Sequence, residues 1–151
     1  GLDHGAWSVL IQMFPKADIP VFQLSVDLSR SPEEHFALAE ELKALRERGV
    51  MIIGSGNLVH NLRAVAWGGG PAYDWAEAFD AHMADAIAKG DYKSVVDAPK
   101  LGRIAQLSHP TFEHFFPALY PLAVADKADE LSFFNEGIDL GSISMRSFML
   151  A

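Results

Sequence analysis

The feature that most constrains the fold is an apolar segment, a well-marked helix and a second apolar segment in direct succession. Residues 21–26 follow a proline and are rich in branched and aromatic side chains, which predicts a buried strand. Residues 50–53 form a second apolar run that begins directly after Gly49. Parallel strands joined by a crossover helix have this order of elements. We therefore predict an α/β fold with a mixed, partly parallel sheet and helices on both faces.

The helix between these segments carries clear signals at both ends. Ser31 and Glu34 have the spacing of a capping box, and Pro32 suits the first helical position. Leucines then recur at helical spacing on one face, basic residues gather near the end, and Gly49 supplies a stop.

The rest of the chain predicts further elements that complete one domain, residues 1–151. Residues 74–89 have the apolar spacing of a helix, and residues 91–107 suggest short helices mixed with loop. Pro110 permits the start of another helix, whereas residues 142–149 alternate with a period of two, which is typical of a strand with one buried face. A length of 151 residues suits a single domain with a substantial core.

Composition narrows the class of partner. The formal net charge of −8 opposes binding to nucleic acid and to anionic membrane surfaces, so we expect a small-molecule partner, no nucleic acid and no membrane. No apolar run approaches the roughly 20 residues that a bilayer span needs. The absence of cysteine is compatible with a cytoplasmic location, and it limits any transition-metal site to imidazole and carboxylate ligands.

His60 lies just beyond the second predicted strand, where ligands bind in parallel α/β sheets. Gly54 and Gly56 let the backbone turn sharply before it. The loop either aims His60 into a pocket or is a tight turn whose histidine bonds the backbone, and the two interpretations are equally favoured. A dinucleotide-binding loop fits poorly because Val59 occupies the third glycine position.

Three more histidines are candidates on weaker grounds. His109 and His114 are five residues apart and do not share a helical face, so they do not form a zincin motif. In a helix that begins near Pro110, His114 projects toward a cleft or is buried in the core, whereas His109 is expected to be a loop histidine. His4 follows Asp3, whose carboxylate can orient an imidazole, although a structural role is favoured from spacing alone.

Other polar and aromatic residues carry weaker signals. Arg63 can meet a substrate carboxylate, but a solvated arginine is the simpler interpretation. Ser25 and Ser55 lie outside a Gly-x-Ser-x-Gly elbow, which makes a serine hydrolase a distant third hypothesis. A group of aromatic side chains can line a pocket for a planar substrate, although core packing explains such residues more often. This group consists of Trp67, Tyr73, Trp75, Phe115 and Phe116.

Five segments taken together resemble the DOPA-type extradiol ring-cleaving dioxygenases, which belong to the superfamily of the protocatechuate 4,5-dioxygenase beta subunit. They are Gly-Leu-Asp-His-Gly-Ala-Trp at residues 1–7, residues 20–27, Gly-Ser-Gly-Asn-Leu-Val-His-Asn-Leu-Arg at residues 54–63, Pro-Thr-Phe-Glu-His-Phe-Phe-Pro at residues 110–117, and residues 136–145. The resemblance covers nearly the whole chain in the correct order.

The resemblance implies a non-haem metal enzyme that cleaves a catechol, DOPA-like or related, with dioxygen as the second reactant. Iron(II) is the expected metal, and zinc can occupy such sites. His114 resembles a metal ligand, and His60 resembles a residue described either as a ligand or as the acid/base beside the metal. His4 resembles a catalytic histidine that contacts substrate or assists proton transfer.

The chain departs from the family pattern in one respect. Two further metal-binding histidines of the family, in a Gly-His-Gly and a Ser-x-His segment, do not occur among these residues. We therefore expect the C-terminal part of a larger dioxygenase domain of ~260 residues, which by itself holds metal weakly or not at all. The alternative functions are a metal-free, noncatalytic α/β binding module and a truncated, inactive fragment.

Overall fold

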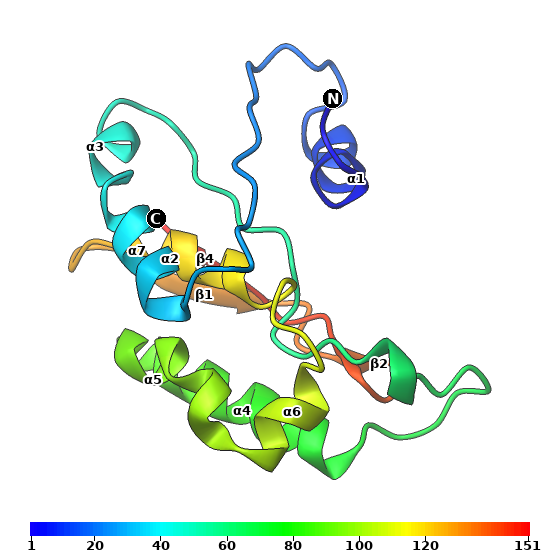
Figure 1. The fold of residues 1–151 in the computed structure, drawn as a ribbon. Coiled ribbons are helices and arrows are strands. Elements are labelled where there is room, and N and C mark those ends of the chain that lie inside the picture. The colour runs from blue at the N-terminus through cyan, green and yellow to red at the C-terminus, as the bar shows by residue number, and fades with distance from the viewer.

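The computed structural model describes residues 1–151 as an assembly of short helices with two small strand pairs (Figure 1). The α-helices are α1 His4–Met13, α2 Pro32–Glu40, α3 Lys43–Arg46, α4 Asp74–Ala88, α5 Tyr92–Val96, α6 Arg103–Ser108 and α7 Leu119–Ala123. The 3-10 turns are η1 Leu62–Ala64, η2 Ala98–Leu101 and η3 Phe116–Ala118. The strands are β1 Leu131–Phe134, β2 Ile138–Asp139, β3 Ile143–Ser144 and β4 Ser147–Leu150. The predicted mixed α/β class is confirmed.

Both strand pairs are antiparallel. Strand β1 pairs with β4, with Leu131 opposite Leu150, and β2 pairs with β3, with Ile138 opposite Ser144. A single isolated bridge joins His60 to Ile143. The loop of His60 is therefore attached to β3.

The parallel pairing expected at residues 21–26 and 50–53 is not found. Both segments run without a ladder partner and are drawn as plain tubes in Figure 1. A strand requires a neighbour that bonds its amide and carbonyl groups, and no strand of this chain pairs with either segment. Their apolar composition indicated burial, yet Phe22 and Met51 are largely exposed.

The helix signals were more reliable than the strand signals. The Ser31 side chain accepts a hydrogen bond from the Glu34 amide, and the Glu34 carboxylate accepts one from the Ser31 amide, which confirms the capping box. The helix is shorter than predicted, because i→i+3 bonds around Leu42 tighten the chain between α2 and α3. Helix α4 matches its prediction closely and buries Phe79 and Met83.

Two predictions near the site were wrong in detail. Pro110 does not begin a helix: residues 110–115 form bends and turns, and the first helical turn is η3. A helix would need the His114 carbonyl for its own ladder, but that oxygen accepts a hydrogen bond from the Asn57 amide at 2.8 Å. The strand predicted at residues 142–149 is split into β3 and β4 around Arg146, whose guanidinium turns inward to Asp80.

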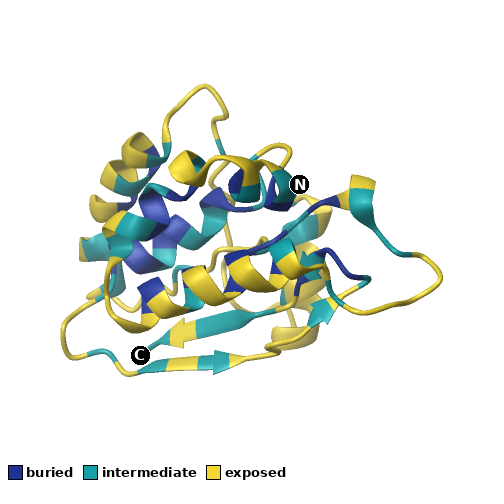
Figure 2. Ribbon diagram, turned by 90° about the horizontal axis from the view of Figure 1, so that it is seen from below, coloured by how far each residue is buried: buried dark blue, intermediate teal, exposed yellow.

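The core surrounds α4, and Figure 2 shows the buried residues gathered on the inner sides of the helices. Phe79, Met83, Phe115, Leu119 and Val59 are fully buried in one cluster. The β1–β4 pair packs against this cluster through partly buried side chains. The segment before His60 is therefore part of the main core.

Many apolar side chains in the first part of the chain are exposed. Helix α1 has no buried residue and stands apart from the helical body in Figure 1. We call the exposed apolar side chains of α1, residues 19–28 and residues 51–53 the open apolar surface. They are Trp7, Val9, Ile11, Met13, Ile19, Val21, Phe22, Leu24, Leu28, Met51 and Ile53. None of the helices has the length and apolar character needed to cross a membrane.

Candidate active site

The structure brings two of the predicted site residues together. The imidazole rings of His60 and His114 are stacked, with centroids 3.7 Å apart and planes inclined by 24°. Both residues are partly accessible to solvent. Histidines separated by more than fifty positions thus form one stacked pair.

Residues 57–61, which we call the His60 segment, are bonded on both sides. On one side, the amides of Asn57 and His60 donate to the carbonyls of His114 and Ser108 at 2.8 and 2.9 Å. On the other side, the Val59 carbonyl accepts from the Ser144 amide at 2.9 Å, and the Asn61 amide donates to Ser142. Backbone hydrogen bonds therefore hold the His60 segment from both sides, and His60 forms an isolated bridge to Ile143.

Asparagine side chains reinforce the His60 segment. Asn57 donates to the Ser144 carbonyl at 2.9 Å, and Asn61 donates to the Leu107 carbonyl at 2.6 Å. The side-chain oxygen of Asn61 accepts a hydrogen bond from the Arg63 amide, and Asn61 thereby caps the start of the η1 turn. Sequence reasoning missed the bond from Asn61 to Leu107, because this partner is 46 positions away along the chain.

The electrostatic environment favours a neutral His60. Burial lowers the pKa of His60, and the neighbouring His114 lowers it further, while Glu113 opposes both effects. Burial acts to raise the pKa of Glu113, but hydrogen bonds from Thr111 and its own backbone, together with the nearby histidines, bring it below its usual value. An uncharged imidazole beside a carboxylate can accept a proton from a bound hydroxyl group.

His4 lies at the start of α1 and is exposed, and it is not part of the ring stack formed by His60 and His114. The Asp3 carboxylate caps α1 through the Ala6 amide and bonds the Gln23 side chain, so it does not orient His4. The helix start is tied to the site loop because the Ser55 hydroxyl donates to the Gly5 carbonyl at 2.7 Å. The Ser55 hydroxyl is thus bonded to a backbone carbonyl and not to a histidine, which disfavours Ser55 as a nucleophile.

His109 lies in the loop directly after α6, as its sequence context suggested, but the structure buries its side chain. Its side chain is 1% exposed and lies in the core, among Phe79, Phe112 and Phe115. Desolvation lowers its pKa to about 4, so the ring is neutral near pH 7.

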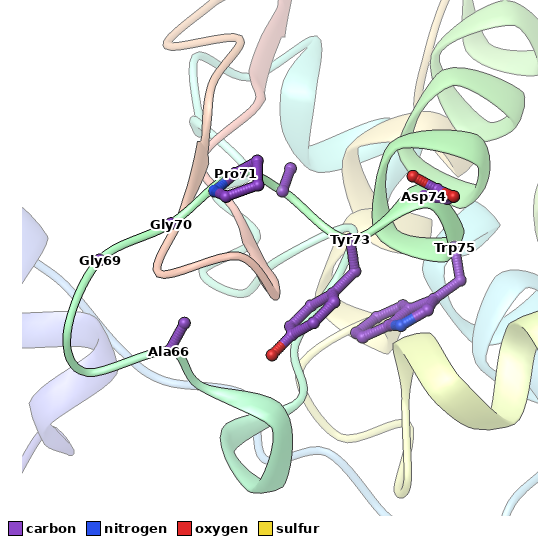
Figure 3. A pocket seen from close by; sticks show the side chains of 8 residues that line it. Ala66, Gly69, Gly70, Pro71, Tyr73, Asp74 and Trp75 are labelled. Carbon is purple, nitrogen blue, oxygen red and sulfur yellow. The ribbon is translucent and has the colours of Figure 1, made fainter.

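The aromatic residues proposed to line a pocket are divided between two places. Tyr73 and Trp75 are stacked, with centroids 5.3 Å apart, and line an open cavity of about 520 Å³ next to the loop of Gly69 and Gly70 (Figure 3). Phe115 and Phe116 are instead buried in the core, whereas Trp67 and Arg63 are exposed. The histidine pair does not line this cavity.

The donor set is incomplete for a metal centre. His60 and His114 supply two imidazoles, but no group of three or more histidine, cysteine, aspartate or glutamate side chains is arranged to hold a metal ion. Stable transition-metal sites usually use three or four protein ligands. Residues 1–151 alone therefore do not form a complete metal site.

The chain shows clear similarity to one family of known proteins. Residues 1–138 match the family model described as the catalytic LigB subunit of aromatic ring-opening dioxygenase. The chain is 41% identical over 156 residues to a 4,5-DOPA dioxygenase extradiol of Escherichia coli K12, with 99% of this chain and 56% of the relative covered. A 4,5-DOPA dioxygenase extradiol of Beta vulgaris is 35% identical over 148 residues, with 98% and 55% covered.

A solved structure agrees with these relatives. The crystal structure of an uncharacterized protein from Escherichia coli K12 superposes on this chain with a TM-score of 0.87 at 41% identity. The superposition covers 98% of this chain and 62% of that chain. The chain spans a little over half the length of the curated relatives described above.

Proposed function

Because the chain belongs to the LigB family of aromatic ring-opening dioxygenases, we propose that it acts as part of a larger extradiol dioxygenase domain that opens a catechol ring with dioxygen. The observation that carries this proposal is the stacked pair of His60 and His114. The two residues come from the two segments of the chain that most resemble active-site motifs of such enzymes.

His60 is proposed as the acid/base or as a ligand. In its neutral form, the imidazole can take a proton from a catechol hydroxyl and later return it to an oxygen of the opened ring. The depressed pKa keeps this form abundant near neutral pH. The hydrogen bonds on both sides of the His60 segment hold the base in one place relative to the substrate.

His114 is proposed as a metal ligand, with the remaining ligands supplied from outside residues 1–151. A non-haem metal, iron(II) by preference, would lower the pKa of the catechol hydroxyls and hold both reactants together. His4 is proposed to approach the substrate from α1, because the Ser55–Gly5 bond docks the start of α1 on the loop before His60.

The proposed substrate is a small aromatic diol. Two relatives that share 41% and 35% identity with this chain are named for 4,5-DOPA, which supports a DOPA-like catechol. A net charge of −8 is compatible with a small-molecule substrate rather than a nucleic acid.

Oxygen consumption with a catechol tests the proposal in the full-length protein loaded with iron(II). The His60→Ala variant should lower kcat at least about 100-fold, the scale of general acid–base catalysis. The His114→Ala variant should also lose most of its turnover, because it removes a proposed metal ligand. His82→Ala is the matched control, because His82 is an exposed histidine on α4. Near-normal turnover in the His60 variant would remove its assignment.

A noncatalytic binding module is the second candidate, favoured by the incomplete donor set. Metal analysis of the full-length protein separates the two. A bound first-row metal that is lost in His114→Ala supports the enzyme, whereas a protein that binds a catechol without metal and without oxygen uptake supports the module.

A further inference from the structure

His109 lies directly behind the His60 segment. The Nε2 atom of His109 is 2.8 Å from the Leu58 carbonyl oxygen, across a separation of 51 residues. Because a carbonyl oxygen only accepts, Nε2 must carry the hydrogen and donate it. The ring is thereby fixed as the Nε2–H tautomer.

On the side of the His60 segment that faces residues 108–114, the Leu58 carbonyl accepts its hydrogen bond from a side chain and not from the backbone. The amides of Asn57 and His60 bond backbone carbonyls of the 108–114 segment. Leu58 is 2% exposed, so water does not readily bond its carbonyl. A buried carbonyl without a partner is unfavourable, and the His109 side chain fills this gap in the ladder.

A histidine is a costly choice at this position unless the bond to Leu58 matters. The Nδ1 atom of His109 is buried and has no hydrogen-bond partner. An orphaned acceptor in a core of Phe79, Phe112 and Phe115 is unfavourable, and a phenylalanine would pack there without this cost. The Nε2 donor is therefore the distinctive contribution of the histidine.

His109 also contacts the segment that carries His114. Its ring stacks on Phe112, with centroids 5.1 Å apart, and meets Phe115 edge to face at 5.2 Å. These two aromatic residues flank His114 closely in sequence. One ring thus bonds the loop of His60 and packs against the turn of His114.

We propose that His109 is a positioning residue that holds the His60 and His114 rings in register through its hydrogen bond to Leu58 and its stack on Phe112. It does not reach the reactants, because its side chain is buried. The effect on turnover rests on the proposed dioxygenase function, but the effect on ring position does not.

Three substitutions separate the hydrogen bond from packing. Gln places an amide nitrogen where Nε2 lies and retains the donor. Asn places its amide nitrogen nearer to the position of Nδ1 and leaves the Leu58 carbonyl unbonded. Phe retains the aromatic packing and removes the donor. Circular dichroism and the thermal midpoint show which variants are folded, and His82→Gln and His82→Phe on the exposed face of α4 are matched controls.

The first readout is NMR of the chain of 151 residues, which needs no activity. In wild type and His109→Gln, the Val59 amide nitrogen, which shares a peptide unit with the Leu58 carbonyl, and the ring signals of His60 should coincide closely. In folded His109→Phe, or in His109→Asn if the Phe variant does not fold, both should move. Unchanged His60 ring signals in a folded variant without the donor would overturn the proposal.

The second readout is steady-state kinetics of the full-length enzyme. His109→Phe should lower kcat about 10-fold or more with little change in KM, because a small displacement of a catalytic group is costly, and His109→Gln should restore most of the loss. Equal loss in the Gln and Phe variants would overturn the role of the Leu58 bond. If wild type lacks ring-cleaving activity while the NMR effects occur, the dioxygenase proposal fails and the positioning role stands.

Discussion

Two glycines set how closely the loop of His60 approaches the turn of His114. A Cβ atom at Gly54 would overlap the carbonyl of Pro117, and one at Gly56 would overlap the carbonyl of His114. Both obstacles are backbone atoms, which cannot swing away as a side chain can. The absence of a side chain at these positions therefore permits the stacked histidine pair.

Gly56→Ala should separate the two segments. We expect a loss of about 1–3 kcal/mol in the free energy of unfolding, the usual scale for overpacking, measured by urea denaturation. Gly68→Ala is the matched control, because an added Cβ at Gly68 meets nothing within 4 Å. An equal effect in both variants would contradict the role of close approach.

The burial of His109 makes stability depend on pH. Its pKa is about 4 in the folded chain and near 6.5 when unfolded, so the unfolded state takes up a proton first as pH falls. The contribution of the neutral His109 ring to the free energy of unfolding is fully present above about pH 6.5, and it is lost as pH decreases toward 4. At about 1.4 kcal/mol per pKa unit, the shift from 6.5 to about 4 corresponds to a loss of at most ~3.5 kcal/mol.

Urea denaturation of wild type and His109→Phe at several pH values measures this effect. The difference in unfolding free energy between the two should change across pH 6.5 to 4 and be constant from pH 7 to 8. A difference that does not vary with pH would show that His109 titrates normally.

At this scale, the sequence singled out His60 and His114, whose rings the structure stacks, but it did not indicate the bond between His109 and Leu58. Glycines before His60 are a local signal, and they mark a real requirement of the backbone. The value of His109 depends on the Leu58 carbonyl, 51 positions away. No pattern of neighbouring residues contains that information.

Among the elements, α4 is joined to β3 and the turn before β4 by a buried polar cluster. Asp80 of α4 accepts a hydrogen bond from the Ser144 hydroxyl at 2.5 Å and pairs with Arg146 at 2.9 Å. Arg146 also pairs with Glu136 and lies over the Phe133 ring. Because Ser144 also bonds Asn57 and Val59, this cluster supports the far side of the His60 segment.

Asp80→Ala should destabilise the chain by about 3 kcal/mol, because it leaves Arg146 partly buried with only Glu136 as a partner. Asp85→Ala on the same helix is the control: its pair with Lys89 is exposed and should contribute less than about 0.5 kcal/mol. Thermal or urea unfolding measures both. Similar losses in the two variants would show that burial of the Asp80 pair does not matter.

Elements with local signals were predicted better than those that depend on partners. The capping box of α2 and the apolar spacing of α4 are complete within each helix. Strands at 21–26 and 50–53 depend on neighbours that this chain does not pair with them. The turn at 110–115 follows from the tertiary bond between Asn57 and His114, which overrides the helix signal of Pro110.

On the scale of the whole molecule, the open apolar surface is unusual for a monomer in water. Large exposed apolar patches generally mark interaction or aggregation sites. Phe22 is 75% exposed and Met51 is 66% exposed. We expect the isolated chain of 151 residues to self-associate with rising concentration.

Sedimentation velocity measures this association. Phe22→Ser should weaken it about 10-fold, consistent with the loss of one buried aromatic side chain. Leu101→Ser, at an exposed apolar position in η2 outside the open apolar surface, should change it little. A wild-type chain that stays monomeric up to high concentration would contradict the expectation.

The attachment of the His60 segment to Ser142 and Ser144 also concerns the time course of folding. These contacts span more than 80 positions, and bonds between such distant residues form late because a long loop must close first. During synthesis on a ribosome, His60 and His114 emerge before the serines that hold His60 in place. The histidine pair should therefore reach its final geometry only after residues 142–144 have left the exit tunnel.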